Sequence, residues 1–136
     1  MRKFAKQLDV MGILQEHDAI LRGHFQLPNG LHSPTYVQTA TVLQYPHIAH
    51  RLALALSNRF PAKVDVVVSP AMGAIVIGQE VARVRRCRNV FFERRGGAMG
   101  LHRHFLLKRG ERVLVVEDIL TTGRSTNDVV MLSALY

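Results

Sequence analysis

The sequence predicts an α/β fold: a doubly wound, mostly parallel sheet with a helix-and-hairpin hood at the N-terminus. Three short apolar runs, at residues 64–68, 89–92 and 112–117, are typical of strands buried on both faces of a sheet. Helical stretches and polar loops alternate with these runs, as they do in parallel sheets with crossover helices. Ligands of such a sheet bind at the carboxyl ends of its strands, so the loops after the runs are candidate sites.

Length and composition exclude several classes of protein. A chain of 136 residues, 48% of them apolar, is large enough for one domain with a buried core and too short for two. No run approaches the roughly 18 apolar residues of a membrane span, and the polar start lacks the apolar core of a signal peptide. The single Cys87 excludes an intrachain disulfide framework. We therefore expect a soluble, cytoplasmic protein without a membrane partner.

Residues 1–45 are expected to form the hood. Apolar residues recur at roughly helical spacing from Phe4 to Leu21, and Gly23 suits the end of that helix. The next segment, residues 25–38, places a Pro-Asn-Gly turn between two short extended stretches, which is typical of a hairpin.

Three more helices are expected along the rest of the chain. Pro46 suits the first turn of a helix that ends at the break at residues 58–61. An apolar stretch from about Ile75 to Val84 follows the first strand, and a last helix begins near Thr126, after the third strand.

The net charge of +8 is confined to one segment. Residues 83–112 hold nine arginines and one lysine against two acids, so the rest of the chain is balanced. This concentration predicts that the segment handles an anion. Within it, Gly96, Gly97 and Gly100 suit a mobile loop, and the four arginines between positions 83 and 88 suit a solvated face at a helix C-terminus.

The strongest functional signal lies between the third strand and the last helix. Glu117 and Asp118 end the strand, and a turn of small and hydroxyl residues at 121–126 (TTGRST) leads into the helix. Small residues let backbone N–H groups converge on a phosphate, hydroxyls add donors, and the helix N-terminus adds partial positive charge. The two carboxylates would repel a bare phosphate and suit nearby sugar hydroxyls or a metal-bound group. The loop therefore predicts a phosphorylated ribose as ligand, and neither a Walker P-loop nor a G-x-G-x-x-G fingerprint occurs.

This loop resembles the phosphoribosyl-pyrophosphate (PRPP) motif of type I phosphoribosyltransferases. Three further segments occur in the same order: GHFQLPNGLHSPTYVQ (23–38), SPAMGA (69–74) and FFERRGGAMGLHRHF (91–105). From about Ile13 onward the chain therefore resembles orotate phosphoribosyltransferases, whose sheet is of the doubly wound kind. The resemblance implies transfer of 5-phosphoribosyl from PRPP to orotate in pyrimidine biosynthesis, which gives orotidine 5′-monophosphate and pyrophosphate. It also implies Mg²⁺ as cofactor and a homodimer with a shared active site.

The resemblance also implies residue roles. Glu117 and Asp118 would hold the ribose hydroxyls and support a cationic sugar, while Arg94 and Arg103 would contact pyrophosphate and His102 would donate a proton. The residues implied in PRPP binding are Ser69, Ala71, Met72, Gly73, Arg95, Ile119, Leu120, Thr121, Thr122, Gly123, Arg124, Ser125 and Thr126. Those implied in orotate binding are Phe25, Tyr36 and Thr121, with core packing as the alternative for the two aromatic residues. No transition-metal site is predicted, because no histidine pair has the spacing of a zinc site.

The chain departs from the family pattern in four respects. His102 and His104 stand where relatives with a short loop have arginine and glycine, Pro28-Asn29-Gly30 stands where a Ser-Gly turn is common, and Arg124 stands where a small residue is usual. The chain ends at Tyr136, inside the helix that follows the motif, so the single domain 1–136 is expected to be incomplete at its C-terminus and weak in activity. Two alternatives stay open: a non-catalytic regulator of the same fold that binds PRPP or a nucleotide, and RNA binding through the basic segment. Nucleic acid is the less favoured partner.

Overall fold

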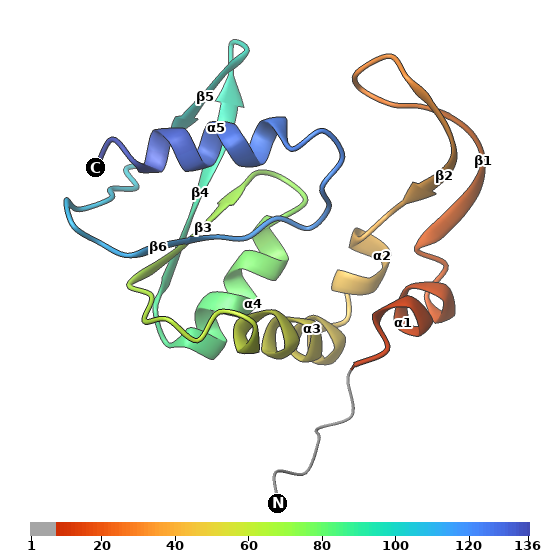
Figure 1. The fold of residues 1–136 in the computed structure, drawn as a ribbon, viewed down its shortest axis with the longest axis horizontal. Helices are drawn as coiled ribbons and strands as arrows, with labels where there is room; N and C mark the ends of the chain where they lie inside the picture. Colours follow the sequence, from red (N-terminus) through yellow and green to blue (C-terminus); the bar gives the residue numbers. More distant parts are fainter. Residues whose placement is uncertain (1–7) are drawn as a thin grey trace, which may run out of the picture.

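The computed structural model describes residues 8–136 and contains a four-stranded sheet and a separate two-stranded hairpin (Figure 1). The strand order of the sheet is β5-β4-β3-β6, with β3, β4 and β6 parallel and β5 antiparallel at one edge. These strands span Val66–Pro70 (β3), Arg88–Arg95 (β4), Ala98–Leu101 (β5) and Val113–Val115 (β6). The predicted α/β fold with a mostly parallel sheet is confirmed, and each of the three apolar runs contributes a strand.

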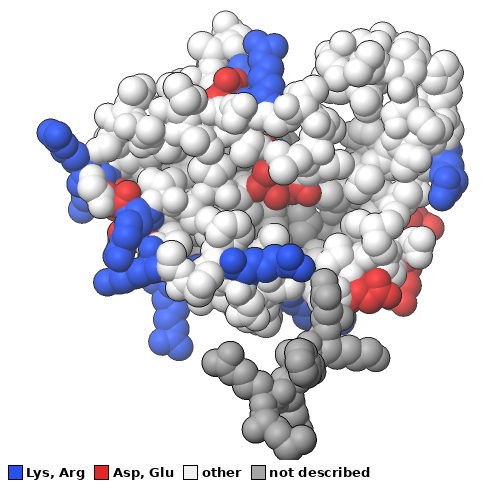
Figure 2. Space-filling view, viewed as in Figure 1, with Lys and Arg blue, Asp and Glu red and all other residues white. Residues whose placement is uncertain are grey.

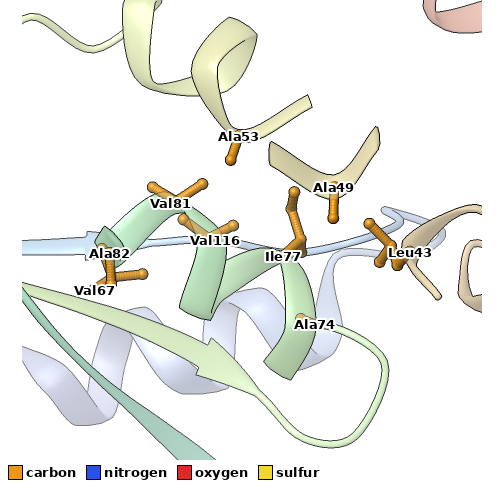
Figure 3. Close-up of a cluster of buried hydrophobic side chains, with 9 residues drawn as sticks. All are labelled: Leu43, Ala49, Ala53, Val67, Ala74, Ile77, Val81, Ala82 and Val116. Carbon is orange, nitrogen blue, oxygen red and sulfur yellow. The ribbon is translucent and has the colours of Figure 1, made fainter. Parts of the chain in front are cut away.

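The central strand β3 separates two hydrophobic cores. Its residues are all buried, and because side chains alternate along a strand, Val67 faces one core while Val66 and Val68 face the other. The helices that cover the sheet span Pro46–Asn58 (α3), Ile75–Arg85 (α4) and Arg124–Ser133 (α5), close to the predicted ranges. Helices α3 and α4 pack over Val67, as Figure 3 shows, and α5 covers the opposite face through Val129. Helices on both faces make the sheet doubly wound.

The first helix is shorter than predicted. Helix α1 spans Val10–Glu16 and does not continue to Gly23, because the chain turns at Asp18, whose φ of +51° lies in the left-handed region. From Ile20 onward the chain pairs as a strand, although its apolar spacing would also suit a helix. Phe4, at the start of that pattern, lies outside the described residues.

The predicted hairpin is confirmed. Strands β1 (Ile20–Gln26) and β2 (His32–Val37) pair antiparallel, and Gly30 lies in the turn between them with a φ of +81°, which glycine adopts at little cost. The short helix α2 (Ala40–Leu43) follows and leads into α3. Figure 1 shows the hairpin standing to one side of the sheet, next to the connection between β6 and α5.

The segment between β4 and β6 contains a strand that the sequence did not predict. Strand β5 pairs with β4 through a turn at Gly96 and Gly97, whose φ values of +58° and +83° are both left-handed. Gly100 lies within β5, opposite Glu93. The three glycines expected in a mobile loop therefore belong to a hairpin, and residues 102–112 form the rest of the connection without a helix or strand.

The charged side chains are unevenly distributed on the face shown in Figure 2. Lysine and arginine crowd the flank that lies away from the β1–β2 hairpin, whereas a group of acidic atoms shows near the centre of the face. No helix among residues 8–136 has both the length and the apolar character that a membrane crossing requires.

Candidate active site

A cavity of about 400 Å³ lies at the carboxyl ends of β3 and β6, with the β1–β2 hairpin as one wall. Its lining comes from the hairpin, from the loop that follows β3 and from residues 117–126 after β6. Three of the segments that the sequence singled out, 23–38, 69–74 and 113–126, therefore meet at one place, whereas segment 91–105 does not line this cavity. That place is the edge of the sheet at which a parallel α/β fold binds its ligands.

The two adjacent acids lie together on this cavity. The Asp118 N–H donates to Glu117 Oε1 at 3.2 Å, and the Thr126 hydroxyl donates to Glu117 Oε2 at 3.2 Å. Partial burial, together with the neighbouring Asp118 carboxyl group, raises the pKa of Glu117 from its ordinary value of 4.5 to about 7. Near neutral pH the pair can thus offer both a carboxylate oxygen and a proton to the hydroxyl groups of a ligand.

The raised pKa of Glu117 predicts a pH dependence of stability. Between about pH 4.5 and 7 the folded protein keeps a proton that the unfolded chain has lost, so the free energy of unfolding falls as the pH rises through this window. Denaturant unfolding of the wild type and of Glu117→Gln, across this range, measures the effect. The wild type should lose stability relative to the variant as the pH rises, and a constant difference would contradict the assignment.

The Asp118 carboxylate contacts Thr39 and lies close to Gly73. The Thr39 hydroxyl, at the N-terminus of α2, donates to Asp118 Oδ2 at 2.5 Å. Gly73 leaves room for the carboxylate, because a Cβ at that position would sit 2.9 Å from the same oxygen. Sequence reasoning missed Thr39, because it lies 79 residues from Asp118 and belongs to no motif.

The turn after the acids has the form of an anion cradle. Every residue from Ile119 to Thr126 lines the cavity. Gly123 adopts a φ of +75° and α5 begins at the next residue, so the unpaired N–H groups of the first helical turn are available to an anion. The Arg124 N–H donates to the Thr122 hydroxyl at 3.3 Å, which closes the turn.

The loop after β3 contributes mainly backbone. Ala71 and Gly73 line the cavity, whereas the Met72 side chain is 84% exposed and lies outside the lining. Ser69 is fully buried, and its hydroxyl donates to Asn89 Oδ1 at 3.4 Å within the sheet. Ser69, which was predicted to bind PRPP, therefore belongs to the core and lies outside the lining of the cavity.

Arg94 and Arg124 lie on a second cavity, of about 450 Å³, on the other side of the cradle. Gly97, residues 27–29 at the tip of the β1–β2 hairpin and three hydroxyl residues of the cradle complete its lining. The Arg94 guanidinium pairs with Asp128 of α5 and donates to the Gly97 carbonyl at 3.2 Å. This ion pair joins the β4–β5 hairpin to the helix that carries the cradle.

The other predicted loop residues lie outside both cavities. Arg103 donates to the two carboxylate oxygens of Glu93 at 2.6 and 3.2 Å, and Arg95 lies 3.6 Å from the same group. These contacts hold the pKa of Glu93 below its usual range, chiefly through the Arg103 hydrogen bonds. The His102 ring packs against Gly100, and its buried Nε2 has no hydrogen-bond partner among the described residues.

Most arginines elsewhere in the basic segment have partners within the fold. Arg83 pairs with Glu80 at 2.6 Å, Arg88 with Glu111 at 2.5 Å and Arg112 with Asp65 at 2.7 Å. Arg85 donates to the backbone carbonyls of Phe60 and Ala62, and Arg86 ends α4 with a left-handed φ of +54°. The expected solvated face is thus a set of ion pairs and helix-end contacts, which leaves fewer free charges for an anion than the sequence suggested.

The residues expected to bind a base lie on the hairpin and the cradle. Tyr36 lines the first cavity, and Thr121 lines both cavities. Phe25 is outside the lining and packs against Tyr36, with 5.6 Å between the ring centroids. Tyr36 and Thr121 are therefore the predicted base contacts that the structure places on the cavity.

The cavity suits a divalent cation that arrives with its ligand. Among residues 8–136 no three histidine, cysteine or acidic side chains form a metal-binding group. The acids on the cavity are Glu117 and Asp118. Mg²⁺ is commonly bound by one or two carboxylates together with the phosphates of a substrate, and this donor set fits that mode.

The chain is similar to known proteins over most of its length. Residues 39–133 match the family model described as the phosphoribosyl transferase domain. Orotate phosphoribosyltransferase of Caldicellulosiruptor saccharolyticus is 43% identical over 125 residues, which are 91% of this chain and 65% of the relative. That of Acidithiobacillus ferrooxidans is 48% identical over 124 residues, 88% of this chain and 64% of the relative. The chain thus spans just under two thirds of the length of these curated relatives.

Solved structures share the fold. The crystal structure of orotate phosphoribosyltransferase from Aeropyrum pernix has a TM-score of 0.72 at 22% identity, over 91% of this chain and 72% of that one. A Mycobacterium tuberculosis orotate phosphoribosyltransferase has a TM-score of 0.67 at 18% identity, over 90% of this chain and 74% of that one. Because the family match covers most of the chain and includes both loops of the cavity, the chain belongs to the phosphoribosyl transferase domain family.

Proposed function

We propose that the chain transfers the 5-phosphoribosyl group of PRPP to orotate, which yields orotidine 5′-monophosphate and pyrophosphate. The observation that carries this proposal is the meeting of the Glu117–Asp118 pair and the 121–126 cradle on one cavity. A phosphorylated ribose needs an anion site and hydroxyl acceptors a few ångströms apart, and the cavity provides both. The curated relatives, which carry the name orotate phosphoribosyltransferase, support orotate as the acceptor.

Different residues of the cavity bind different parts of PRPP in the proposed reaction. The backbone N–H groups and hydroxyls of residues 121–126 hold the 5′-phosphate, and Glu117 and Asp118 accept hydrogen bonds from the ribose hydroxyls. As the pyrophosphate leaves, positive charge develops on the sugar, and the fixed carboxylates stabilise it. The backbone of residues 71–73 and the Arg94 guanidinium orient the pyrophosphate. Glu117 and Asp118 would help to hold Mg²⁺ when PRPP is bound, and the ion would neutralise part of the phosphate charge.

The N-terminal segment 1–45 serves base recognition in this proposal. Tyr36 and Thr121 contact orotate, and Phe25 supports the Tyr36 ring by packing against it outside the cavity. The pyrophosphate is also contacted by Arg95, Arg103 and His102. For this, Arg103 must give up its hydrogen bonds to Glu93 and donate to the phosphate oxygens instead. A homodimer with a shared active site and a cytoplasmic location belong to the same proposal.

A spectrophotometric assay tests the proposed reaction. The protein is mixed with Mg²⁺, PRPP and orotate, and the orotate absorbance is followed as orotidine 5′-monophosphate forms. Loss of absorbance that requires PRPP supports the proposal. PRPP binding without turnover would contradict it and would leave a PRPP-binding protein of the same fold.

Gly73→Ala is expected to impair PRPP use without unfolding the protein. The new Cβ would lie about 2.9–3.1 Å from the Asp118 carboxylate and displace it, while the surrounding core is unchanged. The measurement is the KM and kcat for PRPP, with circular dichroism as the control for folding. Gly110→Ala is the control, because Gly110 lies outside both cavities and no described atom lies within 4 Å of a Cβ there. Its positive φ makes alanine strained, so this variant should lose stability but keep the wild-type kinetics. Equal kinetic losses in the two variants would contradict the close approach of Gly73 to Asp118.

A further inference from the structure

Thr39 lies at the junction between the hairpin and the body of the domain. It follows β2 by two residues, and the preceding Gln38 N–H donates to the Ala19 carbonyl at 2.7 Å, which fixes this end of the hairpin. Thr39 is the N-cap residue of α2, a position at which threonine commonly caps the helix with its hydroxyl. Its hydroxyl makes no capping bond and donates instead to Asp118 Oδ2 at 2.5 Å.

The contact with Asp118 crosses between two cavities. Asp118 lines the polar active-site cavity and also an apolar cavity of about 460 Å³ behind it, whereas Thr39 lines only the apolar one. Val37 and Val42 line that apolar cavity near Thr39. The Thr39 hydroxyl is thus a polar group on a largely apolar wall, and it donates its hydrogen bond to Asp118.

The Thr39 hydroxyl orients the Asp118 carboxylate by a hydrogen bond. The carboxylate lies against Gly73, where the absence of a Cβ leaves room for it, but Gly73 donates no hydrogen bond to it. The Thr39 hydroxyl supplies a directed, charge-assisted hydrogen bond to the carboxylate. The hydrogen bond from Thr39 then selects one orientation of the carboxylate within the space beside Gly73.

We infer that Thr39 is a positioning residue that fixes the Asp118 carboxylate and thereby ties the β1–β2 hairpin to the sugar-binding acid. The inference rests on the proposed function, in which Asp118 acts on the ribose of PRPP. A hairpin that recognises the base then shares a rigid connection with the group that stabilises the sugar. Thr39 itself touches neither substrate.

Kinetics of three threonine variants test this role. Thr39→Val keeps the size and shape of the side chain and removes the hydroxyl, and it is expected to lower kcat about tenfold with KM for PRPP within about twofold. Thr39→Ser keeps the hydroxyl and should restore kcat to within about twofold of the wild type. Thr41→Val is the matched control, because the Thr41 hydroxyl donates only to the Gln38 carbonyl, at 2.8 Å, in the same segment. A kcat for Thr39→Val equal to that of the wild type, or no rescue by serine, would overturn the inference.

A double-mutant cycle tests the contact without turnover. Unfolding is measured for the wild type, Thr39→Val, Asp118→Ala and the double variant, and the two changes are expected to be coupled by about tenfold in the unfolding equilibrium. Additive changes would overturn the Thr39 inference even if the protein is an active transferase. If the two changes are coupled but the wild type shows no turnover, the proposed function is overturned, while Thr39 is still supported as the residue that positions Asp118.

Discussion

Asp118→Asn is expected to lower kcat/KM for PRPP on the order of 10²-fold, with little change in the fold. The substitution keeps the size of the side chain and an oxygen that can accept the Thr39 hydrogen bond, but it removes the negative charge. In the proposed reaction that charge faces the sugar while positive charge develops on it, so the loss would fall on the transition state. Steady-state kinetics with orotate in excess measure the effect.

Arg85→Ala is the control for this prediction. Arg85 belongs to the basic segment 83–112, which the sequence predicts to bind an anion. In the structure it donates to the Phe60 and Ala62 carbonyls just after α3 and lies outside the lining of the active-site cavity. Its kcat/KM should stay within about twofold of the wild type. Similar losses in Arg85→Ala and Asp118→Asn would show that the site has been placed wrongly.

Phe92→Ala is expected to lower the free energy of unfolding by about 3–5 kcal/mol. Phe92 is 1% exposed and packs with Val66, Val68 and Val129 in the core between the sheet and α5. Truncation leaves a cavity beneath the helix that carries the phosphate cradle. Denaturant unfolding measures the loss. PRPP affinity should fall as well, because the position of the cradle depends on the packing of α5 against the sheet.

Phe60→Ala is the matched control for the core substitution. Phe60 has a side chain that is 54% exposed, and its carbonyl contact with Arg85 does not depend on the ring. The expected change in the free energy of unfolding is within about 0.5 kcal/mol. Comparable losses at the two positions would contradict the placement of the core between β4 and α5.

The features that could be predicted from the sequence are local ones. The run around Val67 forms a strand because a continuous β-branched run suits a central, fully buried parallel strand, and the apolar run around Val90 pairs beside it. The 121–126 cradle is contiguous, so its composition and its position before a helix were enough to predict a phosphate site. Its geometry agrees with that reading, with a left-handed Gly123 at the start of α5.

The features that escaped prediction depend on contacts between distant parts of the chain or on local turns without a clear signal. The end of α1 is set by Asp18, a non-glycine residue with positive φ, while the apolar spacing beyond it still suits a helix. The pairing of Arg94 with Asp128 spans 34 residues, and that of Thr39 with Asp118 spans 79. Such pairs follow from the order of the strands, and one sequence does not show which side chains that order brings together.

The carboxylate pair and the cradle are proposed to form a single site for a phosphorylated ribose. Isothermal titration of the protein with PRPP in the presence of Mg²⁺, repeated with ribose 5-phosphate as competitor, measures whether they do. We expect one saturable PRPP site per chain that ribose 5-phosphate displaces, because both ligands need the 121–126 cradle and the two acids. Absence of PRPP binding, or binding that ribose 5-phosphate leaves unchanged, would contradict it.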